Sequence, residues 1–252
     1  MQEITPETPS GQTEGAFRLH ATIRAALSPG IWFVLAAQLA LLFSLHWRVP
    51  AEAAPLLSVL AVFLTATTLL AFFYLQAGAF HALTQGRGAL SVTEVLRAGK
   101  PVFVNFVWLT LKAGLLFALA MYVLVLVVLA LTGTDFKHLM ELLSSTFGPM
   151  TGVMGFVFVY WLPLVFVRHE FRLLPTLKAS LQIAWSRLGH AAFLALLVVA
   201  PALVFGILPA DSPLLVDALA SLASGFLGWI AYIYCVDILQ RQRLDTPAES
   251  LS

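Results

Sequence analysis

The six histidines are the residues of this chain best suited to bind a metal ion or to transfer a proton. They lie far apart in the sequence, at His20, His46, His81, His138, His169 and His190. No two of them form the HxxxH or HExxH pattern that places two imidazoles on one face of a helix. The single cysteine, Cys235, excludes an intrachain disulfide and a multi-cysteine metal site. The sequence therefore predicts no metal site.

Acid–base chemistry within a membrane needs carboxylates near the midplane, and the candidates lie elsewhere. Asp217 and Asp237 are near opposite ends of one apolar run, and Asp237 forms an i, i+4 pair with Arg241. The chain has no Walker loop, no GxSxG and no nucleotide-binding glycine motif. We therefore expect that the protein is not an enzyme and that it binds no cofactor.

Three polar side chains interrupt apolar runs and could together form a polar seam. They are Gln38, Gln76 and His81, and Tyr74 precedes the last two in the same run. A seam of this kind is typical of a solute pathway, but hydrogen bonds between packed helices explain the same residues equally well. The sequence leaves both interpretations open.

The composition indicates what surrounds these residues. Of 252 residues, 60% are hydrophobic and 11% are charged, with a mean hydropathy of +0.91. Soluble domains are about 45–50% apolar and about 25% charged. We therefore expect an integral membrane protein surrounded by lipid. A net charge of +1 without a basic tail indicates no nucleic-acid partner.

Six apolar runs approach the roughly 20 residues that a membrane-spanning helix needs. They cover residues 31–47, 55–80, 113–132, 149–167, 191–208 and 214–236. Each must be helical in lipid, because only a helix or a closed barrel satisfies the backbone there. The polar ends, residues 1–15 and 243–252, are predicted to be disordered tails on either side of one membrane domain, residues 16–242.

The positive-inside rule orients these spans. With the N-terminus in the cytoplasm, all of the 14 Lys and Arg residues except Arg48 and Lys137 fall in cytoplasmic segments. We therefore expect both termini to lie in the cytoplasm.

A short element recurs three times before an odd-numbered span. The copies are Ile23–Ala26, Leu96–Gly99 and Leu177–Ser180, each an aliphatic residue, a cation, Ala and a small residue. The expected fold is therefore all-α, with six transmembrane helices in three hairpin repeats, about 16–84, 91–168 and 173–240, each preceded by a cytoplasmic amphipathic segment. Chance similarity between Ala- and Leu-rich segments is the alternative.

Cations in and near these elements are predicted to contact lipid headgroups. They are Arg24, Arg97, Lys100, Lys112, Lys178 and Arg187. Lys112 follows a mostly apolar stretch, but residues 113–132 already supply a full span, so we expect Lys112 at the boundary, where it can snorkel. Residues 100–111 would then be an interfacial or re-entrant piece.

Small residues recur every four positions in the last span. They are Ser221 with Gly225, and Ser224 with Gly228. This spacing lets helices approach closely. It is compatible with packing inside one chain and with a dimer interface.

The segment from Val159 to Phe205 resembles the corresponding part of YciC-like, uncharacterised six-span proteins of the bacterial inner membrane. The similarity rests on Pro163, on residues 168–170 (RHE) and on 177–181 (LKASL), followed by the exit 232–243 (YIYCVDILQRQR). It covers roughly residues 155–243. It implies a topology and the bacterial inner membrane, and it carries over no functional residue.

These observations favour a non-catalytic multi-pass protein that organises or assists membrane components, with lipids as partners and other membrane proteins or a second copy as further candidates. The alternative is a transporter or channel for a small solute or lipid, since transporters are often built from repeats.

Overall fold

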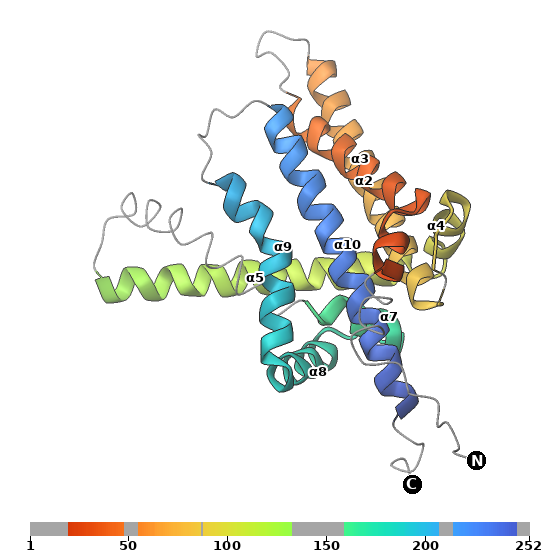
Figure 1. The fold of residues 1–252 in the computed structure, drawn as a ribbon. Coiled ribbons are helices and arrows are strands. Elements are labelled where there is room, and N and C mark those ends of the chain that lie inside the picture. Colours follow the sequence, from red (N-terminus) through yellow and green to blue (C-terminus); the bar gives the residue numbers. More distant parts are fainter. Residues whose placement is uncertain (1–19, 48–54, 87, 133–158, 207–213, 246–252) are drawn as a thin grey trace, which may run out of the picture.

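The computed structural model describes residues 20–47, 55–86, 88–132, 159–206 and 214–245, and all regular structure within them is helical (Figure 1). Residues 20–26 form a first short helix. The helices that follow are α2 (Pro29–His46), α3 (Pro55–Thr84), α4 (Val92–Gly99), α5 (Phe103–Thr132), α7 (Trp161–Arg168), α8 (Leu173–Ser186), α9 (Leu188–Gly206) and α10 (Leu214–Asp245).

Local sequence explains where several of these helices begin and end. Pro29 is the first residue of α2. The backbone N–H at this position has no partner within a helix, so proline, which lacks an N–H, removes no hydrogen bond there. Ser91 and Glu94 form a capping box at the start of α4. His169 ends α7 in the left-handed conformation, with φ of 52°.

Four of the described helices are long and apolar enough to cross a membrane. They are α2, α3, α5 and α10. Helices α8 and α9 pass the same criterion only as a pair, bent by 109° at a break, which raises the number to five if the pair is one span. The all-helical class is thus confirmed. Of the predicted fourth span, residues 149–158 lie outside the described part of the chain.

Two predicted boundaries differ from the structure. Residues 103–132 form one continuous helix, α5, so the stretch before Lys112 is not a separate piece. Pro101 lies before this helix and no proline lies inside it, so nothing in the sequence breaks it. Helix α10 ends at Asp245, three residues beyond the expected domain end at 242. The tails 1–15 and 246–252 lie outside the described residues.

The core lies where the second half of α3 meets α4, α7 and α10. Gly78 of α3 touches the α4 backbone so closely that a Cβ there would lie 2.1 Å from the Val95 carbonyl oxygen. The Tyr74 hydroxyl donates a hydrogen bond of 2.6 Å to the Leu96 carbonyl oxygen of α4. Glycine at position 78 therefore sets how closely the two helices pack.

The three short recurrent elements share a pattern of burial. The residue just before each element is buried (Thr22, Val95 and Thr176), as is the last small residue of the element (Ala26, Gly99 and Ser180), and the cation between them is exposed. Each short helix ends at a break before a longer apolar helix begins.

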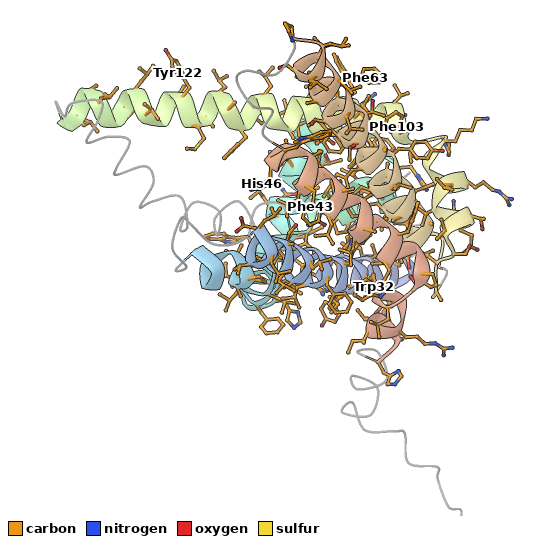
Figure 2. The ribbon with its side chains drawn as sticks, turned by 90° about the horizontal axis from the view of Figure 1, so that it is seen from above. Trp32, Phe43, His46, Phe63, Phe103 and Tyr122 are labelled. Carbon is orange, nitrogen blue, oxygen red and sulfur yellow. The ribbon has the colours of Figure 1, made fainter. Side chains whose placement is uncertain are left out.

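The outer half of α5 stands apart from the other described helices. Figures 1 and 2 both show this end of α5 extending beyond them, and Figure 2 labels Tyr122 on it. Figure 1 also shows α5 running across the direction of α9 and α10. Helix α5 is a candidate membrane span because of its length and its apolar composition. Its direction relative to the other helices does not enter that criterion.

Candidate functional site: a cavity between the helices

A cavity of about 480 Å³ lies where five helices meet. Its walls come from α2, α3, α7, α9 and α10 and from Val159. The lining residues are Gln38, Phe72, Gln76, Phe80, Val159, Leu162, Pro163, Val198, Ser224, Gly225, Gly228, Trp229, Ala231 and Tyr232. None of them is charged. The cavity is therefore suited to an apolar molecule with a few hydrogen-bonding groups.

One end of the cavity is fixed by a contact between α2 and α10. The Gln38 side-chain amide donates hydrogen bonds to the Ser221 carbonyl oxygen (3.0 Å) and to its hydroxyl oxygen (2.9 Å). A Cβ at Gly225 would lie 2.7 Å from both Gln38 Oε1 and Leu35 Cδ2. Ser221 and Gly225 thus act in packing within one chain.

The second small pair faces the open space instead. Ser224 and Gly228 line the cavity, and a Cβ at Gly228 would meet no atom within 4 Å. The four-residue spacing predicted close packing for both pairs. The structure separates them, because a Cβ at Gly225 would overlap side chains of α2, whereas one at Gly228 would meet no atom, although Gly225 also borders the cavity.

Aromatic rings form much of the wall. The Phe80 ring packs on the rings of Trp229 and Tyr232, with centroids 4.8 and 4.4 Å away. The Tyr232 hydroxyl donates a hydrogen bond of 3.0 Å to the Phe80 carbonyl oxygen. Sequence reasoning missed these residues, because an aromatic side chain in an apolar run gives no signal that distinguishes a cavity wall from a lipid contact.

The three residues of the predicted polar seam separate into two places. Gln38 and Gln76 line the cavity, whereas His81 does not. His81 is buried beside His169, with ring centroids 5.3 Å apart, and its Nε2 lies 3.1 Å from the Gln85 amide nitrogen. Within the described residues the seam is therefore not continuous from Gln38 to His81.

The cations predicted to contact headgroups are all at least partly exposed. Arg24, Arg97, Lys100, Lys112 and Lys178 are exposed, and Arg187 is half-buried at the break between α8 and α9. Lys112 Nζ lies 5.2 Å from the centre of the Trp108 ring, within range of a cation–π contact. A helix of 30 residues is about 45 Å long and exceeds a hydrocarbon core by about 15 Å. Lys112, in the tenth position of α5, can therefore lie near the boundary.

The part of the chain that the structure describes contains no cluster of metal-binding side chains. No group of three or more His, Cys, Asp or Glu side chains there could hold a metal ion. Asp237 accepts a bond from Arg241, and Asp217, in the first turn of α10, is 3.9 Å from His46.

The described features define an all-helical protein with several helices apolar enough to cross a membrane and a cavity between them. Neither a protein-family model nor a curated protein nor a solved structure matches the chain. The YciC-like resemblance therefore stays a prediction.

Proposed function

We propose that the chain is a non-catalytic, multi-pass protein of the bacterial inner membrane that organises or assists other membrane components. Its proposed topology has six spans in three hairpin units, with both termini in the cytoplasm. Its proposed partners are membrane lipids and, through them, other membrane proteins or a second copy.

The orientation of α8 carries this proposal. Its small residues Thr176, Ser180 and Ala184 face the protein, whereas Leu181 and Trp185 point outward and are exposed. Leu173, Leu177 and Ile183 of the same helix pack against the core, so α8 has large apolar residues on both its inner and its outer face, whereas an amphipathic helix of a soluble protein keeps its outer face polar. Lys178 is on the exposed side as well. A surface of leucine, tryptophan and lysine fits the boundary between acyl chains and anionic headgroups.

The bend after α8 supports the same placement. Helix α9 is apolar along its length, and α8 leaves it at 109°. If α9 crosses the membrane, α8 lies close to the membrane plane, at the level where Arg187 joins the two.

The two described ends of the chain lie together, in agreement with a shared side for both termini. Thr22 and Ala25 line one hollow with Asp237, Gln240 and Arg241 of α10. The Gln240 side-chain amide also donates a hydrogen bond of 2.6 Å to the Thr84 carbonyl oxygen at the end of α3.

A photo-crosslinking residue at position 185 tests the proposal in native membranes. Trp185 is 77% exposed, and the adjacent Ala184 is fully buried. We expect position 185 to give adducts with phospholipid or with a second protein, and position 184 to give only intramolecular products. Equal products at both positions, or none from position 185, would count against an interfacial α8.

Transport of a lipid or small solute is the second candidate function. The uncharged cavity between α2, α3 and α10 favours it, because it offers an apolar molecule a place between helices. Purified protein in liposomes should then accelerate exchange of a fluorescent phospholipid between leaflets. Exchange at the rate of empty liposomes would leave only the first proposal.

A further inference from the structure

We propose that the cavity binds one acyl chain of a membrane glycerolipid, with the Gln76 amide donating a hydrogen bond to the ester carbonyl of that chain. The inference rests on the proposed membrane location and names the ligand class of the transport candidate. It concerns the interior between the helices and is independent of what the outer face of α8 contacts.

The walls favour a hydrocarbon chain. Apolar and aromatic side chains make up most of the lining, and no charged side chain is among them. An ion or a sugar would lose its hydration there without replacement partners. The volume of about 480 Å³ is within the range of ligand pockets, about 300–1,000 Å³. In a membrane, the molecule with immediate access to a space between helices is lipid.

The Gln76 amide favours an ester over a plain hydrocarbon. A glutamine amide has two donor hydrogens and an acceptor oxygen. The Gln38 amide is satisfied by Ser221, whereas the half-buried Gln76 amide makes no hydrogen bond to the described residues. The Gln76 side chain is half-buried and lines the cavity, so an ester carbonyl there would accept a hydrogen bond from one of its donors.

The depth of Gln76 matches the level of an ester. Gln76 lies eight residues before Thr84, about 12 Å along the helix axis, and the 30 residues of α3 exceed a hydrocarbon core by about 15 Å. We place this excess at the Thr84 end, where the short cation-bearing helices pack. Gln76 then lies near the edge of the hydrocarbon, and Gln38, midway along α2, lies deeper beside the chain.

Trp229 offers a direct readout, because it lines the cavity and is 5% exposed. The test protein has Phe in place of the four exposed tryptophans, Trp32, Trp47, Trp108 and Trp185, and keeps Trp161 and Trp229. It is reconstituted in phosphatidylcholine vesicles with or without bromine atoms on the acyl chains. We expect bromine to quench the tryptophan fluorescence, because an acyl chain inside the cavity would contact the Trp229 ring.

Gly228→Leu and Gly114→Leu form a matched pair for this experiment. Both glycines lie in apolar helices with open space at the Cβ, but only Gly228 lines the cavity. Leucine at 228 should fill the cavity and abolish the quenching, whereas leucine at 114 should leave it unchanged. Equal quenching in the two variants, or none in the parent, would show that no acyl chain occupies the cavity.

The role of Gln76 has its own measurement, the number of lipids retained in native mass spectrometry from mild detergent. Gln76→Leu should retain diester phosphatidylcholine about fivefold less well, the worth of about one hydrogen bond. Its retention of the dialkyl ether analogue should equal that of the parent. Gln182→Leu on the exposed face of α8 is the control. An equal loss of both lipids would assign Gln76 a packing role and overturn the ester contact.

Discussion

The two halves of α5 have nearly the same kind of sequence and very different surroundings. Its first half inserts Phe106 and Leu109 into the core, against α3 and α7. Its second half carries Leu119 and Tyr122, both exposed, and Figure 2 shows this end of the helix, with Tyr122, extending beyond the other described helices. Apolar character alone therefore does not distinguish a residue that packs against protein from one that faces lipid. The difference lies in which residues meet a partner helix.

The core end should be sensitive to any added volume. Gly78→Leu should have the largest effect, because even a Cβ at position 78 overlaps the backbone of α4. We expect loss of the folded protein in mild detergent, measured by size-exclusion profile and thermal unfolding. Gly114→Leu is the control, with open space at its Cβ, and should unfold at or above the parent temperature because leucine favours helix over glycine. Similar losses in both variants would mean that α3 and α4 do not pack as described.

Two phenylalanines of α3 separate packing from lipid contact within one helix. Phe80 contacts the rings of Phe106, Phe166, Trp229 and Tyr232, whereas Phe63 is exposed. Phe80→Ala should lower the free energy of unfolding by about 3–5 kcal/mol. Phe63→Ala should change it by less than about 1 kcal/mol, since that ring faces lipid before and after unfolding within the membrane. Titration with SDS in mixed micelles measures both, and comparable values would contradict the assigned core.

Two leucines test the contrast within α5 itself. Leu109 is 1% exposed and Leu119 is 58% exposed. Leu109→Ala should lower the free energy of unfolding by about 2–5 kcal/mol, because it leaves a cavity that the core does not refill. Leu119→Ala should cost less than about 1 kcal/mol. A large loss at Leu119, measured by the same SDS titration, would show that a second copy or another part of the chain covers the outer half of α5.

The smallest expected effect concerns one hydrogen bond. Tyr232→Phe removes the bond to the Phe80 carbonyl oxygen and keeps the ring, so it should lower the free energy of unfolding by about 1 kcal/mol. Tyr122→Phe, on the exposed half of α5, should have no measurable effect. If the two changes have the same effect, the Tyr232 hydroxyl does not bond as described.

Much of the architecture could be predicted from the sequence, because length and hydropathy act on each helix separately. The helical class and the cations at the ends of the apolar runs follow from the sequence. The expected start of the first span, at residue 31, differs by two residues from Pro29, where α2 begins. The cavity could not be predicted, because its lining combines residues as distant as Gln38 and Tyr232. The separation of His81 from Gln76, in contrast, follows from helix geometry, since five residues at about 100° each place the two side chains about 140° apart around α3.

The sequence by itself determined that the chain is helical and apolar enough for a membrane, because a long uninterrupted run of apolar residues has no other stable form there. It also determined where the cations lie along the chain. Only the tertiary structure decided that Ser221 and Gly225 pack on α2 while Ser224 and Gly228 face open space. Packing is a property of two surfaces together, and a residue pattern describes only one of them.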